Sequence, residues 1–62
     1  MKLTGIISGT ENTEIILTRG KESVVISNGE TRAGITLLAV DEAGGSAVVD
    51  DGYGERTLYL GR

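Results

Sequence analysis

The chain contains no cysteine and no histidine among its 62 residues. Their absence excludes thiolate and imidazole metal sites, catalytic pairs built on a Cys or His nucleophile or base, and disulfide bonds. A cysteine-free chain suits a reducing cytosol and an oxidising periplasm equally, so the compartment stays open. Most common enzyme constellations are thereby excluded, and we expect a protein that is not an enzyme and that needs no cofactor and no metal.

Aromatic and basic residues are also scarce. Tyr53 and Tyr59 are the only aromatic residues, which leaves little surface on which nucleic-acid bases could stack. Nine acidic residues outnumber six scattered basic ones, and the net charge of −3 disfavours a nucleic-acid partner held through its phosphates. No apolar run reaches the roughly 18 residues of a membrane span and no signal peptide is visible, so we expect no direct membrane contact. The length predicts a single domain, residues 1–62.

Short runs of β-branched and aliphatic residues recur about every ten residues, separated by Gly, Asn and Asp. This spacing is typical of all-β proteins, and no stretch keeps a helical periodicity over the dozen or so residues that a helix would need. It predicts six short antiparallel strands that form a small two-sheet β-sandwich or a bent barrel. The predicted strands are Lys2–Ser8, Thr13–Thr18, Glu22–Ser27, Ile35–Asp41, Ser46–Asp50 and Glu55–Leu60.

Alternation along each strand predicts which side chains face the core. Tyr59 should point away from it, and Ile35–Asp41 has apolar residues on both faces. That strand is therefore either buried on both faces or carries a bulge that switches its facing. The residues predicted to point inward elsewhere are Leu3, Ile7, Ile15, Leu17, Leu58 and Leu60.

Gly29 and Gly34 have the spacing that opens a nucleotide-binding P-loop. A P-loop needs a Lys and then Ser or Thr directly after the second Gly, followed by a helix whose N-terminus faces the phosphates. Here Ile35 and Thr36 follow and begin a predicted strand. The segment is interpreted as a connection between strands that binds no phosphate.

The acidic turn near the end of the chain offers oxygen ligands of the kind that calcium prefers. Asp50, Asp51 and Glu55 surround two glycines, but their spacing does not match an EF-hand loop. Acid–base catalysis by paired carboxylates would need a cleft that raises one pKa, and a sandwich this small offers little concavity. Solvated turn residues are the favoured interpretation.

The first predicted strand is a candidate interaction surface, because Lys2–Ser8 carries one charge only, at its start. An exposed sheet edge without charges recruits other strands. Gly5 in its middle would let another backbone approach closely, or would bend the strand so that it moves between sheets. Alternation also leaves Ile6 and Ile16 as outward aliphatic residues on neighbouring strands. The predicted partner-binding residues are Thr4, Gly5, Ile6, Ile16 and Thr18.

The order of these segments resembles the periplasmic homology-region domain of type II secretion system protein C and its PilP-like relatives among pilus-assembly lipoproteins. The opening segment resembles the family's Leu-x-Gly followed by two aliphatic residues, and the last resembles a closing hairpin that ends in Leu-x-Leu. The segments that carry the resemblance are Leu3–Ile7, Thr13–Leu17, Ser23–Gly29, Gly34–Asp41, Ala47–Val49, Gly52 and Glu55–Leu60.

The resemblance implies a non-catalytic adaptor that belongs to an inner-membrane-anchored parent and lies in the periplasm. It would dock on the first periplasmic domain of the outer-membrane secretin of a type II secretion or type IV pilus system, with no nucleic-acid partner and with room for weak homo-oligomerisation. Two alternatives stay open on sequence grounds: a small SH3-like barrel that binds nucleic acid or a small ligand, and a stand-alone phage or structural protein.

Overall fold

The computed structural model describes residues 1–61. These residues form an all-β fold without any helix, and hence without a helix that could cross a membrane. The prediction of a small two-sheet antiparallel architecture is confirmed, although there are seven strands rather than six. The strands are β1 (Lys2–Ser8), β2 (Thr13–Arg19), β3 (Glu22–Ser27), β4 (Thr31–Arg32), β5 (Ile35–Asp41), β6 (Ser46–Asp50) and β7 (Glu55–Tyr59).

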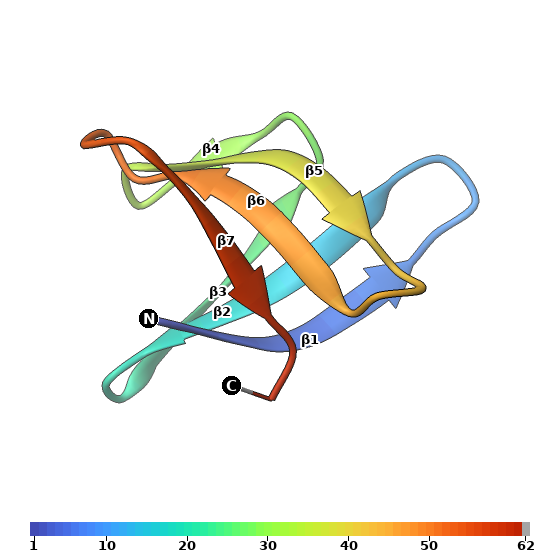
Figure 1. Ribbon diagram of the computed structural model, residues 1–62, viewed down its shortest axis with the longest axis horizontal. Helices are drawn as coiled ribbons and strands as arrows, with labels where there is room; N and C mark the ends of the chain where they lie inside the picture. The colour runs from blue at the N-terminus through green and yellow to red at the C-terminus, as the bar shows by residue number, and fades with distance from the viewer. Residues whose placement is uncertain (62) are drawn as a thin grey trace.

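The strands are arranged in two antiparallel sheets that pack face to face (Figure 1). The first sheet has the order β1-β2-β3 and the second the order β4-β5-β6-β7, so every neighbour in a sheet is also a neighbour in the sequence. In the view of Figure 1 the strands of one sheet cross those of the other, and the sheets do not close into a barrel. The sandwich of the two predicted arrangements is the one that forms.

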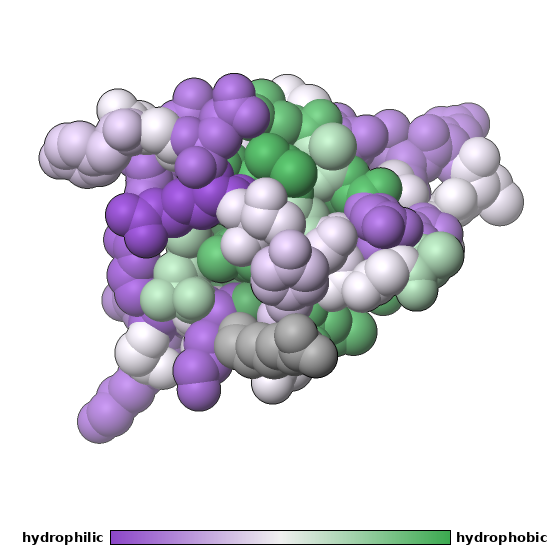
Figure 2. All heavy atoms as spheres, in the orientation of Figure 1, coloured by the Kyte–Doolittle hydropathy of each residue, from purple (hydrophilic) through white to green (hydrophobic). Residues whose placement is uncertain are grey.

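The core lies between the two sheets and is wholly aliphatic. Both sheets contribute to it because alternate residues of each strand point to the same face. Figure 2 shows hydrophobic residues reaching the surface along the middle of the molecule, with hydrophilic residues at both ends. The buried residues are Leu3, Ile15, Leu17, Ile26, Ile35, Leu37, Ala47 and Val49, with Ile6, Val24, Val40 and Leu58 packed against them.

A β-bulge in β1 reverses the facing of its second half. Leu3 pairs with Leu17 but Gly5 pairs with Ile16, so one strand residue, Thr4, is inserted without a partner. An inserted residue exchanges the inward and outward positions beyond it. The alternation-based prediction was therefore wrong for the two isoleucines that follow.

Those two isoleucines exchange their predicted places. Ile6 was expected to face outward but packs against the core. Ile7 was expected to face inward but is 44% exposed. Because β1 stays in one sheet throughout, the bulge shifts the facing of its side chains without moving the strand between sheets.

A second bulge lies at the corresponding place in β5. Leu37 pairs with Val49 and Ala39 with Val48, which leaves Leu38 as the inserted residue. Leu37 is fully buried, Leu38 is 44% exposed, and Val40 packs against the core. Of the two predictions for this strand, the bulge is confirmed, and burial of both faces is wrong.

The two bulges make one half of the sandwich a structural repeat of the other. In each half a bulged strand is followed by two further antiparallel strands, and the inserted residue lies between two core-facing positions, Leu3 and Ile6 in one half and Leu37 and Val40 in the other. Gly5 and Ala39 therefore occupy equivalent outward positions, each directly after its inserted residue.

The end of the chain leaves β7 and runs along β1. Leu60 was predicted to face the core, but it follows β7 and is 45% exposed. Its amide donates a hydrogen bond to the carbonyl oxygen of Gly45 (2.7 Å), and the amide of Gly61 donates to that of Leu3 (3.3 Å). Leu58 faces inward and Tyr59 outward, both as predicted.

The segment from Gly29 to Gly34 connects the two sheets. The amide of Gly29 donates to the carbonyl oxygen of Leu37, and Thr31–Arg32 then forms the two-residue strand β4, which the sequence pattern did not predict. Ala33 and Gly34 follow, with φ angles of 54° and 76°, as the central residues of a two-residue hairpin turn between β4 and β5. Gly34 leads into a strand, as the sequence indicated.

The carboxylate of Glu42 joins the two sheets at one end of the sandwich. It accepts a hydrogen bond from the hydroxyl of Thr13 (2.9 Å). Side-chain hydrogen bonds from Ser8 and then Thr13 lower the pKa of Glu42 below its ordinary value of 4.5. The turn between β5 and β6 is thereby held to the last residue of β1 and the first residue of β2.

This bond gives the first prediction, which concerns pH. Because the pKa of Glu42 is lower in the folded state than in the unfolded state, its stabilisation is present above pH 4.5 and disappears as the pH falls through the folded-state pKa. We expect the wild type to resist urea better than Glu42→Gln at about pH 7, and the difference to close towards about pH 3.

The measurement is the urea midpoint of both proteins across that pH range. Glu11→Gln is the control, because the exposed Glu11 makes no ion pair among the described residues. A difference between wild type and Glu42→Gln that stayed constant, or grew on acidification, would contradict the prediction.

Candidate functional site

Four of the five predicted partner-binding residues lie together on the outer face of the first sheet. Gly5 pairs with Ile16, and Thr18 lies two pairs further along the same hairpin, close to Thr4. Ile6 is the exception, because the bulge turns it towards the core. We call this outer face, together with the adjoining edge of β1, the β1 surface.

A row of hydroxyl groups fixes one side of the β1 surface. The Thr4 hydroxyl donates to the Ile16 carbonyl oxygen (3.2 Å) and lies 3.1 Å from the Thr18 hydroxyl. The Thr18 hydroxyl in turn lies 3.1 Å from that of Ser23 on β3. These bonds tie all three strands together and give the inserted Thr4 a side-chain partner.

Beside the hydroxyls runs an apolar row across the sheet. Gly5, Ile16 and Val25 are aligned on the three neighbouring strands, and Val25 is 39% exposed. Ile7 is exposed on the same face, two residues along β1 from Gly5. Sequence reasoning missed Val25 and Ile7 as surface residues, although alternation between the inward Val24 and Ile26 would have indicated the first.

Gly5 also has a structural role within its own sheet. An ideal Cβ placed on it would lie 3.0 Å from Cδ1 of Ile16, so the Ile16 side chain occupies the space that a side chain at position 5 would need. Its φ angle is not in the left-handed region that favours glycine. The missing side chain thus accommodates a neighbour within the same sheet, and a larger residue requires only that the end of a flexible isoleucine moves.

Along its edge, β1 borders a shallow groove. Leu3, Ile6 and Leu60 supply its apolar lining, and the backbone of Gly5 and Gly61 supplies much of the rest. Because Gly61 already donates to the Leu3 carbonyl oxygen, the end of the chain covers part of this strand edge. A partner therefore meets side chains and a groove here, with that carbonyl already bonded.

The acidic turn between β6 and β7 uses its carboxylates internally. Asp50 accepts the amide hydrogen of Gly52 (2.8 Å) and Asp51 that of Tyr53 (2.9 Å). Asp51 also pairs with Arg56 at 2.7 Å, and the bond from the Tyr53 amide is the main cause that lowers the pKa of Asp51. Within residues 1–61 no group of three or more acidic side chains is arranged to hold a metal ion.

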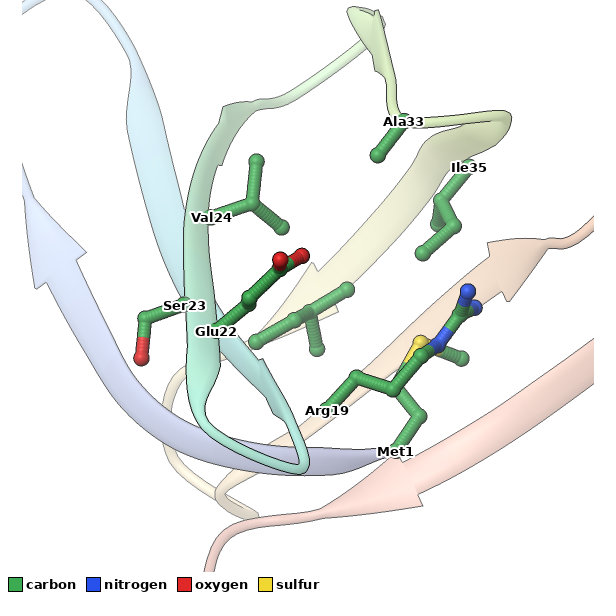
Figure 3. A pocket seen from close by; sticks show the side chains of 8 residues that line it. Met1, Arg19, Glu22, Ser23, Val24, Ala33 and Ile35 are labelled. Carbon is green, nitrogen blue, oxygen red and sulfur yellow. The ribbon is translucent and has the colours of Figure 1, made fainter.

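At the end of the sandwich that carries the turn between β2 and β3 there is a second hollow, of about 80 Å³. Figure 3 shows Val24, Ala33 and Ile35 pointing towards one another across the space between β3 and the β4–β5 turn, with Arg19 near its mouth. We call this hollow the end pocket. Its lining residues are Met1, Leu17, Arg19, Glu22, Ser23, Val24, Ala33 and Ile35.

Comparison of the chain with protein-family models, with curated proteins and with solved structures finds no significant match.

Proposed function

We propose that the protein is a non-catalytic interaction module of a type II secretion or type IV pilus system, and that it docks on the first periplasmic domain of the outer-membrane secretin. The resemblance of its segments to the homology-region domain supports the identity of the partner. The same proposal places the module in the periplasm, as a domain of an inner-membrane-anchored protein.

The observation that carries a docking role is the apolar row on the β1 surface. Ile16 and Val25 present aliphatic side chains on an outer sheet face, where polar side chains are usual because the face contacts water. The hydroxyl row beside them holds the three strands in place, so little order has to be gained on binding. A partner would bury this row and leave the polar residues at the rim.

The covered carbonyl of Leu3 favours face docking over strand addition at that point. A contact made by a few aliphatic side chains is weak. Several copies arranged around a secretin ring would strengthen it through avidity. Specificity would come from the shape of the Ile16 and Val25 row and from the groove beside Leu60.

The experiment is a titration of isotope-labelled protein with the first periplasmic domain of a type II secretion secretin, followed by amide chemical shifts. Gly5→Arg places a long charged side chain in the row, and we expect it to weaken binding at least about tenfold while the domain stays folded. Ala39→Arg is the matched control, because it introduces the same charged side chain at the equivalent outward position of the other sheet.

Binding by the wild type and Ala39→Arg but not by Gly5→Arg, with shifts centred on Ile16 and Val25, is the expected result. Shifts confined to residues 35–60, or equal binding by a folded Gly5→Arg variant, would show that docking uses another face. No binding by any of the three proteins would reject the secretin fragment as the partner.

A further inference from the structure

The turn between β6 and β7 displays a single aromatic side chain. Tyr53 is 96% exposed, which makes it the most exposed of the large apolar side chains described. Gly52 and Gly54 flank it, and nothing lies within 4 Å of the position that a Cβ would take on either glycine. The ring is therefore left uncovered on both sides.

The turn that carries Tyr53 is held in one conformation by its own hydrogen bonds. Asp50 and Asp51 each accept an amide hydrogen from within the turn, the Asp51 amide donates to the Gly54 carbonyl oxygen (3.3 Å), and Arg56 pairs with Asp51. A tyrosine on a fixed turn loses little conformational entropy when it is buried by a partner, which is why tyrosines are common at the centres of interfaces.

The end pocket lies at the same end of the sandwich as Tyr53. The pairing of Thr36 with Asp50, and of Asp50 with Glu55, places the β6–β7 turn beside the β4–β5 turn that lines the pocket. Figure 1 shows the turns between β2 and β3, β4 and β5, and β6 and β7 on one side of the molecule. The turn that carries Tyr53 and the turns that line the end pocket therefore lie on the same side of the molecule.

The charges around the two features are complementary. Arg19 and Glu22 both line the pocket and Lys21 lies in the adjoining turn, and none of the three forms an ion pair within residues 1–61. On the β6–β7 turn, Asp50 and Glu55 likewise form no ion pair among the described residues, since Arg56 pairs with Asp51. The pocket and its adjoining turn thus carry two cations and one carboxylate, and this net positive charge is opposite to that of the acidic turn that carries the aromatic ring.

We propose that the protein forms a symmetric dimer in which Tyr53 of each copy enters the end pocket of the other. Because knob and pocket lie at the same end, one two-fold rotation satisfies both contacts and closes the assembly. A cavity of about 150 Å³ holds a whole benzene ring. The end pocket, at about 80 Å³, takes the edge of the tyrosine ring and leaves its hydroxyl at the rim near Arg19.

The backbone of Ala33 gives independent support to a binding role for the pocket. Its φ of 54° lies in the left-handed region, where the first position of such a two-residue turn usually holds Asn, Asp or Gly. An alanine here strains the turn but places a methyl group at the pocket. Strain retained in the lining of a hollow indicates selection for something other than stability.

The experiment is sedimentation equilibrium of the chain alone from about 20 µM to about 2 mM, because a two-knob interface of this size is expected to dissociate at about 0.1–1 mM. We expect Tyr53→Ala to raise the dissociation constant at least about tenfold, and Tyr53→Phe to change it less than about threefold, because the ring and not the hydroxyl enters the pocket. Leu38→Ala should leave it unchanged, because Leu38 is an exposed aliphatic residue of β5 that does not line the end pocket.

Ala33→Asn distinguishes an effect on dimerisation from an effect on the stability of the fold. It creates the Asn-Gly sequence that this turn prefers, so the variant should melt a few degrees higher than wild type. It should nevertheless dimerise several-fold more weakly, because an amide replaces the methyl group at the pocket. Gly5→Arg should dimerise like wild type, which keeps this inference distinct from docking at the β1 surface.

A chain that stays monomeric over the whole concentration range would overturn the proposal. So would a dimer that Tyr53→Ala leaves intact, since it would have to form through another surface. Dimerisation of Ala33→Asn at wild-type strength would overturn the role of the end pocket as the receptor.

Discussion

Replacing Leu37 by alanine is expected to lower the free energy of unfolding by about 2–5 kcal/mol, whereas the same change at the adjacent Leu38 should lower it by less than about 1 kcal/mol. Leu37 is fully buried between the sheets, so its truncation leaves a cavity. Leu38 is the inserted residue of the β5 bulge and is 44% exposed. The free energy of unfolding of a domain this small is about 5 kcal/mol, so Leu37→Ala should be largely unfolded at moderate temperature.

Urea unfolding followed by circular dichroism measures both variants. Both variants replace a leucine by alanine, so any difference in their stability reflects the burial of the two positions and not the type of substitution. Equal losses of stability would mean that Leu38 is buried as well as Leu37, which is the arrangement of a strand with both faces covered.

The second large effect is expected in β1, where Ile6→Asp should unfold the domain and Ile7→Asp should not. Ile6 packs against the core, so an aspartate there would place a carboxylate against apolar side chains at a penalty of several kcal/mol. Ile7 is 44% exposed and lies on the outer face, where a carboxylate stays hydrated. We expect Ile7→Asp to remain within about 1 kcal/mol of wild type.

Amide spectra of the two variants at equal concentration provide the measurement. A dispersed spectrum for Ile7→Asp with a collapsed one for Ile6→Asp is the expected pair. Uninterrupted alternation from Leu3 predicts the opposite result, a collapsed spectrum for Ile7→Asp and a dispersed one for Ile6→Asp. That result would show that β1 has no bulge at Thr4.

The strands were predictable because their signals are local. β-Branched residues and the glycines between them give the bounds of β1, β3, β5 and β6 without error, since each run is as long as the strand it forms. The two-residue β4 has no such run, because its formation depends on pairing with β5. Leu60 was assigned to the last strand because its alternation continues past Tyr59, but the chain turns away there to contact β1.

The facing of side chains was predictable only up to the first bulge of each strand. One inserted residue, Thr4 or Leu38, reverses the inward or outward facing of every later residue in its strand. Neither a threonine nor a leucine marks a bulge in the sequence. Thr4, Gly5, Ile16 and Thr18 were still grouped correctly, because they lie close to the bulge or on the unbulged β2. The end pocket was out of reach, because it is built by segments whose proximity only the packing of the two sheets determines.

The repeated bulge has a consequence for how the chain folds. Each half is a series of hairpins between sequence neighbours, so strand pairing can begin locally and quickly in either half. Neither the three-stranded nor the four-stranded sheet can bury its apolar face alone, because the core lies between them and each sheet is covered by the other. Docking of the two units is then the slow and cooperative step. Cleavage in the connection between Ser27 and Thr31 would give two fragments, each with an exposed apolar sheet face. Neither fragment should fold alone, and mixing the two should restore the fold.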